Sequence, residues 1–275
     1  MARKLIAPSL NQSDSVWELF HENSKASVHA PFRMDRVGEE YMHRMQESLA
    51  FEAYPEVRLP EDAALPQVPL QEAITGRIVA DVLEPCYLSL KTVAALLRHS
   101  YGVIGGSDKA GAFRQPRAVH SAGSHYPLEL FIHGTRVDGL DAGLYHYNPP
   151  NNSLRRIQNG DHSHKIAPSF TDRRFINATM TVFIAAILER SAFLYGDRGY
   201  RFAMLEAGAV VQNLNLAAYS LGLACGNLGE FYDREIDAVL ALDGLTISTV
   251  YIVAIGKPLV EQDVNNKQHP IGVLK

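Results

Sequence analysis

The stretch FAMLEAGAVVQNLNLAAYSLGL, residues 202–223, is the most strongly patterned part of the chain. Its apolar residues recur at intervals of three and four, which predicts an amphipathic α-helix. The apolar stripe is wide and built largely of small residues: Met204, Ala207, Gly208, Val211, Leu214, Ala218 and Leu221. Small side chains allow neighbouring elements to approach closely, so we expect a central helix that ends at Gly222.

Strand patterns lie on both sides of this helix. Residues 127–137 and 248–258 are rich in β-branched or alternating apolar residues, which favours strands. Residues 143–157 predict two strands joined by a tight turn at 148–152, where Asn and Pro gather. The apolar run 178–188 fits a buried strand or a helix segment, and its Thr, Val and Ile favour the strand.

A second helix is predicted over residues 88–102, with Ser89 as its N-cap and Gly102 as its stop. Helices and strands do not alternate in a regular βαβ order, so the fold class is α+β. The glycines match neither a dinucleotide-binding nor a P-loop pattern.

The N-terminal part of the chain has a different sequence pattern from the rest. Tyr41, Met45 and Leu49 have helical spacing within a polar region, which predicts one amphipathic helix. Residues 54–73 contain four prolines and predict an extended connector. We therefore divide the chain into a helical extension with its connector, residues 1–66, and a main domain, residues 67–275.

Composition limits the classes of function. The chain has 275 residues, 47% of them hydrophobic, and its net charge of −4 argues against a nucleic-acid partner. Cys86 and Cys225 have no metal or CxxC spacing, which favours a reduced, cytoplasmic protein. The start of the chain lacks the apolar core of a signal peptide, and no apolar run reaches the length of about 18 residues that a membrane span needs.

Two polar stretches could carry chemistry. In RAVHSAGSHYPLELF, residues 117–131, small residues precede a strand, and their backbone N–H groups could hold a flat or anionic ligand. An ordinary turn is the alternative. His120 and His125 lie in the same loop, but no third metal ligand is evident, so we expect no metal.

The second stretch is LYGDRGYRF, residues 194–202, directly before the central helix. Arg198 and Arg201 could bind a phosphate, because a guanidinium matches its oxygens well. An ion pair with Asp197 or Glu206 at the start of the helix is the alternative.

Together these segments resemble the SagB-type dehydrogenases, a branch of the FMN-dependent nitroreductase family. HSAGSHYPLE is similar to the PSAGxLYPLE loop of that branch, and GLYHYNP is similar to the hairpin that follows it. Residues 195–223 resemble the central helix with its lead-in, and residues 227–258 resemble the closing strand region. Glu18 to Lys25 is similar to the N-terminal part of this branch.

The resemblance implies a nitroreductase-like fold, with a central, mostly antiparallel sheet flanked by helices, in an intertwined homodimer that binds FMN at the subunit interface. It also implies oxidation of azolines to azoles in a peptide or peptide-derived substrate, in which FMN takes a hydride and a side chain removes a proton. Tyr195 is then the catalytic residue. The implied cofactor-binding residues are Arg77, Ser121, Ala122, Gly123, Ser124, Arg198, Arg201, Leu228 and Gly229.

Several positions depart from the family pattern. Where nitroreductases carry RRSxR, this chain keeps Arg77 but has Val79 and Asp81, and a carboxylate there would repel flavin phosphate. Leu194 replaces the lysine that precedes the family's tyrosine, and Ala209 replaces a histidine of the central helix.

The loop and the tail differ as well. His120 and His125 stand where the family has proline and leucine. No arginine follows Gly256, where nitroreductases commonly place a phosphate-binding base, and Lys257 and Lys267 are candidate cations there.

These departures leave three functions open. The first is an FMN-dependent azoline dehydrogenase, which acts alone or with other biosynthetic enzymes. The second is a flavin oxidoreductase of the same fold with a different reaction, favoured by the loss of the lysine before Tyr195. The third is a flavin-free, non-catalytic scaffold subunit, favoured by Val79 and Asp81.

Overall fold

The computed structural model describes residues 16–25, 49, 51–78, 82–105, 115–171 and 175–259. The predicted helix at Tyr41–Leu49 lies outside these residues except for Leu49, and Val79, Asp81 and Lys267 also lie outside them.

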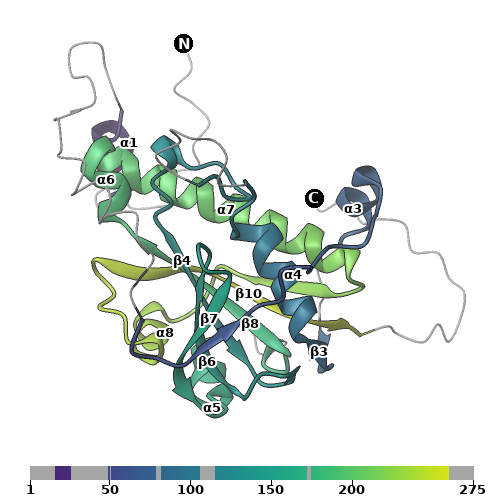
Figure 1. Ribbon diagram of the computed structural model, residues 1–275. Coiled ribbons are helices and arrows are strands. Elements are labelled where there is room, and N and C mark those ends of the chain that lie inside the picture. The colour runs from purple at the N-terminus through teal and green to yellow at the C-terminus, as the bar shows by residue number, and fades with distance from the viewer. Residues whose placement is uncertain are drawn as a thin grey trace, which may run out of the picture.

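A large sheet forms the centre of the molecule (Figure 1). Seven of its eight described strands follow the order β1-β7-β6-β4-β8-β10-β2, and the eighth, β9, pairs with β10. Each of these pairs is antiparallel. The strands are β1 (Glu56–Arg58), β2 (Leu83–Glu84), β4 (Leu128–Gly134), β6 (Gly143–Asn148), β7 (Ser153–Asn159), β8 (Met180–Ile187), β9 (Ala224–Leu228) and β10 (Ile247–Pro258). Two short strands, β3 (Leu88–Ser89) and β5 (Val137–Asp138), form a separate parallel pair.

Helices cover the sheet and extend beyond it. The α-helices are α1 (Trp17–Asn23), α3 (Leu70–Gly76), α4 (Leu90–Tyr101), α5 (Ser163–Ile166), α6 (Glu189–Tyr195), α7 (Asp197–Ser220) and α8 (Asp233–Leu240). Short 3₁₀ turns form η1 (Ala122–Ser124) and η2 (Ala167–Ser169). The long helix α7 packs against α4, with α6 at one of its ends and α3 at the other (Figure 1).

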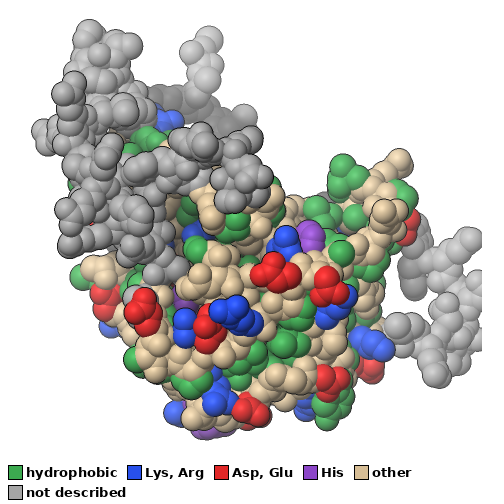
Figure 2. Space-filling view, viewed as in Figure 1, with side chains coloured by type: hydrophobic (Ala, Val, Ile, Leu, Met, Phe, Trp, Pro, Cys, Tyr) green, Lys and Arg blue, Asp and Glu red, His purple; other side chains and the backbone are tan. Residues whose placement is uncertain are grey.

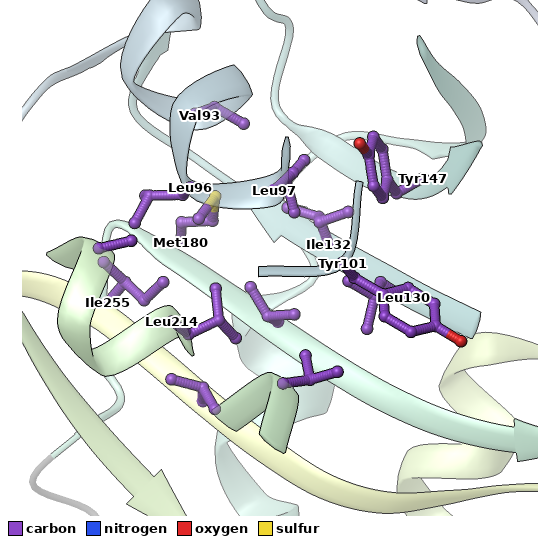
Figure 3. Close-up of a cluster of buried hydrophobic side chains, with 14 of the residues drawn as sticks. Val93, Leu96, Leu97, Tyr101, Leu130, Ile132, Tyr147, Met180, Leu214 and Ile255 are labelled. Atoms are coloured by element: carbon purple, nitrogen blue, oxygen red, sulfur yellow. The ribbon is translucent and has the colours of Figure 1, made fainter. Parts of the chain in front are cut away.

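Each face of the sheet has its own hydrophobic core. Leu130 and Ile132 of β4 point to the core under α4 and α7, whereas Phe131 between them points to the opposite core beside α8. This alternation follows from the two-residue period of a strand. In Figure 3 the side chains of α4 and α7 meet those of the sheet, for example at Leu96, Leu214 and Ile255.

Most expected elements are confirmed. Helix α4 has Ser89 as N-cap, whose hydroxyl accepts the Thr92 N–H, and Gly102 as C-cap. The ambiguous run 178–188 is a strand, β8, buried along nearly its whole length. The main sheet is antiparallel and helices flank it, so the α+β prediction is confirmed.

The central helix differs from its prediction in two respects. It begins at Asp197, before the apolar pattern starts, and its buried face is rotated from the predicted stripe. Gly208 was assigned to the stripe, but it is exposed and a Cβ there would meet nothing within 4 Å. Glu206, a charged residue, lies on the buried face instead.

The boundary at residue 66 stays a prediction. The structure adds that β1, which precedes this boundary, is an edge strand of the main sheet and pairs with β7.

The surface carries mixed charge. On the face seen in Figure 2, acidic and basic side chains are interspersed among apolar and neutral polar groups.

Candidate active site

The loop before β4 has an unusual backbone. Gly123, Ser124 and Tyr126 have φ angles of 58°, 55° and 46°, in the left-handed region that non-glycine residues rarely adopt. The Ser124 and His125 N–H groups close the 3₁₀ turn on Ser121 and Ala122. The first N–H groups of such a turn have no acceptor within the turn, so they are suited to a ligand.

Tyr195 lies directly against this loop. A Cβ built on Gly123 would come within 2.7 Å of the Tyr195 hydroxyl and 2.9 Å of the His125 ring. The loop and the tyrosine are 72 residues apart in the sequence (195 − 123), and the fold brings them into contact. Only glycine leaves room for that contact.

The substitution Gly123→Ala should therefore move the Tyr195 hydroxyl and strain the turn. We expect it to lower the free energy of unfolding by about 2–3 kcal/mol, measured by urea denaturation, from left-handed strain plus the steric overlap. The matched control is Gly222→Ala, which has a φ of 68° but open space around its Cβ, and should cost only about 1 kcal/mol. Equal losses for the two variants would contradict the close contact.

Glycines also explain why Tyr195 ends a helix. Gly196, with φ of 54°, separates α6 from α7, and its N–H caps α6 by bonding the Ala192 carbonyl. A Cβ on Gly199 would lie 2.4 Å from the Ser191 carbonyl carbon, so α7 crosses α6 at this point. Residues 194–202 are therefore a helix-to-helix corner that holds Tyr195 at the loop.

Aromatic and basic side chains surround the tyrosine. Its ring makes edge contacts with His125 and Phe202, at centroid distances of 6.2 and 5.0 Å. The Arg198 guanidinium lies 5.9 Å from the centre of the Phe202 ring. Arg201 donates a hydrogen bond to the Ser24 hydroxyl beside α1, at 3.3 Å. Arg198 thus lies beside Phe202, which separates it from Tyr195, while Arg201 is turned toward the N-terminal segment.

A buried arginine supports the loop from below. The Arg117 guanidinium is stacked between the Tyr101 and Tyr126 rings, 4.6 and 4.7 Å from their centres. The Arg117 N–H donates to the Tyr126 hydroxyl at 3.0 Å. Asn213 of α7 donates to the Ala118 carbonyl at 3.1 Å. These contacts attach the first half of the loop to α4 and α7.

A second buried charge pair fixes the end of the loop to β4. Arg190 donates to Glu129 at 2.6 Å and to the Tyr126 carbonyl at 3.3 Å, and His146 lies 2.7 Å from the same carboxylate. Burial alone would raise the pKa of Glu129, but Arg190 and His146 outweigh this effect and hold the pKa at about 2. The carboxylate is therefore ionised and paired at neutral pH.

Glu206 is the other acidic group beneath the loop. It accepts a hydrogen bond from the Tyr101 hydroxyl at 2.9 Å. Burial raises the pKa of Glu206 to about 7, against the opposing effects of the Ser121 and Tyr101 hydroxyls and of Arg117. The suggested ion pair of Glu206 with an arginine at the start of α7 is replaced by this buried arrangement.

An apolar pocket of about 390 Å³ lies further along α7. The connector residues Leu65, Pro66 and Val68 form one wall, and Asn213 and Leu216 of α7 form part of the other. Its volume is in the usual range for a small-molecule site. It lies between the loop at Ala118 and helix α3.

The other predicted cofactor-binding residues lie elsewhere. Arg77 follows α3, whose last residue, Gly76, lies against the Tyr219 side chain near the end of α7. Leu228 is buried in β9 and Gly229 follows it, with β8 and β10 between β9 and β4. Tyr195 and Arg77 are thus at opposite ends of a helix about 35 Å long (Figure 1). One chain does not bring all the predicted residues together.

Sequence reasoning missed the supporting residues Tyr101, Arg117, Glu129, Arg190 and Glu206. A signal existed for Glu206, since helical spacing places it on the same face as Ala203 and Val210. The partners of the other four come from separate elements, and no spacing within one segment predicts them.

Residues 92–257 match the sequence pattern of the Nitroreductase family, and the chain belongs to this family of oxidoreductases. It is 35% identical over 190 residues to a nitroreductase-family protein of Methanocaldococcus jannaschii, covering 68% of this chain and 90% of the relative. It is 26% identical over 175 residues to the microcin B17-processing protein McbC of Escherichia coli, covering 62% of each.

Solved structures share the fold. A nitroreductase-family protein from Anabaena variabilis superposes with a TM-score of 0.70 at 22% identity, over 88% of this chain and 47% of that one. A chain of the E. coli McbBCD complex with truncated pro-MccB17 superposes with a TM-score of 0.56 at 20% identity, over 91% of this chain and 92% of that one. A nitroreductase-family protein from Exiguobacterium sibiricum, solved in complex with FMN, superposes with a TM-score of 0.50 at 10% identity, over 75% of this chain and 95% of that one.

Within the residues described, no helix is both long and apolar enough to cross a membrane. The same residues contain no cluster of three or more His, Cys, Asp or Glu side chains suited to a metal ion.

Proposed function

We propose that this protein is an FMN-dependent oxidoreductase that acts on a peptide or peptide-derived substrate, with azoline-to-azole oxidation as its leading reaction. The observation that carries the proposal is the contact between the Tyr195 hydroxyl and Gly123 at an exposed turn. The family supports the cofactor, and the similarity to McbC supports the substrate class. The fold shared with a chain of the pro-MccB17 complex supports action together with other biosynthetic enzymes.

The turn fits a flat, anionic cofactor. Its outer surface is made of glycine and small residues, Ala122, Gly123 and Ser124, so a ring system can approach the backbone closely. Arg198 adds a positive charge beside Phe202, the ring that contacts Tyr195. Ser121 differs from its sequence-based role, because its hydroxyl accepts the Tyr126 N–H inside the protein at 2.9 Å. We therefore assign the cofactor contact at Ser121 to its backbone.

The separation of Tyr195 and Arg77 supports a homodimer as part of this proposal. If two copies pack with their α7 helices antiparallel, Arg77 of one copy comes to the end of α7 where the other copy holds Tyr195. Arg77 is exposed and so available for such a contact. Exposed apolar side chains on α7, Tyr200 and Leu205, support an interface along this helix. In this arrangement each FMN is held by both subunits.

Within the site, Tyr195 is placed to take or relay the proton that leaves the substrate. Bound FMN would accept the hydride, which is the redox part of the reaction. Arg198 holds positive charge beside Phe202, whose ring contacts Tyr195, and Leu194 replaces the family's lysine. The replacement also favours the second candidate, a different flavin reaction that needs no strong base.

Complementation between two inactive variants tests the shared site. We expect Arg77→Ala and Gly123→Asp each to weaken FMN binding by at least about tenfold, because one loses a cation and the other places a carboxylate in the turn. Unfolding and refolding an equal mixture should restore tight sites, because a mixed dimer has one site with both residues intact.

The readout is flavin fluorescence quenching, with each variant refolded alone as the control. Recovery in the mixture supports the shared site. If the mixture binds no better than the separate variants, FMN is not shared between subunits in this way.

A further inference from the structure

The backbone at Tyr126, the last residue of the loop before Pro127 and β4, is strained. Its φ angle is 46°, in the left-handed region. A bulky residue rarely adopts a positive φ, and a residue that precedes proline is normally restricted to extended conformations. Such strain persists only where the surrounding structure holds it, and it gathers at functional sites. The contacts of Tyr126 therefore show what the strain is used for.

Every polar atom of Tyr126 is hydrogen-bonded. Its N–H donates to the Ser121 hydroxyl at 2.9 Å, which spans the turn. Its carbonyl accepts a hydrogen bond from Arg190 at 3.3 Å. Its hydroxyl accepts the Arg117 N–H at 3.0 Å. Tyr126 thus joins the beginning of the loop, the turn and helix α6, which also carries Tyr195.

The ring of Tyr126 is buried and adds a second kind of contact. It lies 4.7 Å from the Arg117 guanidinium and makes an edge contact with Tyr101 at a centroid distance of 6.3 Å. Glycine would adopt a positive φ without strain, but it would supply neither the ring nor the hydroxyl. This position therefore uses the tyrosine side chain at the cost of a strained backbone.

We infer that Tyr126 is a positioning residue of the candidate site: it fixes the turn through Ser121 and helix α6 through Arg190. The two groups that it aligns are Gly123 in the turn and Tyr195 at the end of α6, which lie in contact. This inference rests on the proposed function, because it assigns a purpose to the loop that would receive FMN. Tyr126 is buried and acts through its neighbours, so it is not a catalytic residue.

Two variants of Tyr126 separate its side chain from its backbone. Tyr126→Phe keeps the ring and removes the acceptor of the Arg117 N–H, whereas Tyr126→Gly relieves the strain and removes the whole side chain. Single-turnover oxidation of a thiazoline peptide at saturating FMN should slow by about tenfold in Tyr126→Phe and by about 30-fold in Tyr126→Gly, because a small misplacement of reacting groups is costly.

The matched control is Tyr145→Phe. Tyr145 is a buried tyrosine of β6, and its hydroxyl donates to the Asp141 carbonyl at 2.6 Å, so this variant also loses one hydrogen bond to the backbone. It should keep the single-turnover rate within about twofold of wild type, because it does not touch the loop. A Tyr126→Phe rate equal to that of Tyr145→Phe, or a wild-type rate in Tyr126→Gly, would overturn the inference.

Amide exchange followed by NMR tests the same link without flavin. Exchange at the Arg117 N–H should be at least about tenfold faster in Tyr126→Phe than in wild type, and unchanged in Tyr145→Phe. An unchanged Arg117 rate in Tyr126→Phe would also overturn the inference. A wild-type protein that binds no FMN would overturn the proposed function alone, since the exchange experiment needs no cofactor and still decides whether Tyr126 holds the loop.

Discussion

Replacing Arg190 by methionine is expected to lower the free energy of unfolding at pH 7 by about 3–5 kcal/mol. Arg190 and Glu129 are 4% and 2% exposed, and their bond is 2.6 Å long. Methionine fills a similar volume but leaves the carboxylate buried without its guanidinium, and the desolvation cost of that charge is no longer offset. Urea denaturation followed by circular dichroism measures the loss.

The pH dependence gives the prediction a second test. The folded pKa of Glu129, about 2, is below its ordinary value of 4.5, so its stabilising contribution is present above about pH 4.5 and is lost as the pH falls toward 2. The difference between wild type and Arg190→Met should therefore shrink below about pH 4.5.

The matched control is Arg156→Met. Arg156 pairs at 2.5 Å with Asp141, which is 81% exposed, so its loss should change stability by no more than about 1 kcal/mol. A small effect of Arg190→Met, or one equal to that of Arg156→Met, would show that the buried pair does not hold the loop to β4.

The substitution Tyr195→Phe is expected to reduce the rate of azoline oxidation by at least about 100-fold while leaving the affinity for FMN within about threefold of wild type. Phenylalanine keeps the ring contacts with His125 and Phe202 but removes the hydroxyl that lies against Gly123. The measurement is single-turnover oxidation of a thiazoline peptide, followed by mass spectrometry for loss of two hydrogens.

Tyr200→Phe is the control, because it removes a hydroxyl from a half-exposed tyrosine of the same helix that packs against Phe20 of α1. It should leave the rate unchanged. If the Tyr195→Phe protein oxidises the peptide as fast as wild type does, the tyrosine hydroxyl does not take or relay the proton that leaves the substrate. That result would favour a flavin reaction that proceeds by hydride transfer alone.

Local patterns were sufficient to predict several of the regular elements, although the start of α3, at Leu70, falls within the stretch predicted as an extended connector. Helix α4 was located from Ser89, its apolar face and Gly102, and β8 was identified from its β-branched residues. Helix α6 was missed because it has only seven residues, Glu189–Tyr195, too few to show a helical repeat. Its end at Gly196 depends on a positive φ, which sequence alone does not reveal.

The candidate site was only partly predictable. The loop and Tyr195 were both singled out, but their contact depends on the corner between α6 and α7, which is a tertiary feature. Arg77 was grouped with them, yet α3 places it at the far end of α7. A list of residues along the chain cannot show this separation, which the proposed dimer would resolve by bringing Arg77 of one copy to the loop of the other.

The most direct test of the account is the visible absorption spectrum of the purified protein, recorded before and after incubation with FMN and desalting. We expect a retained flavin band whose absorbance corresponds to about one FMN per chain, because each copy contributes one turn and one Arg77. Light scattering should give the mass of a dimer, which then holds two FMN molecules. A protein that stays colourless after incubation would contradict FMN-dependent function, and the scaffold alternative would then be the one to pursue.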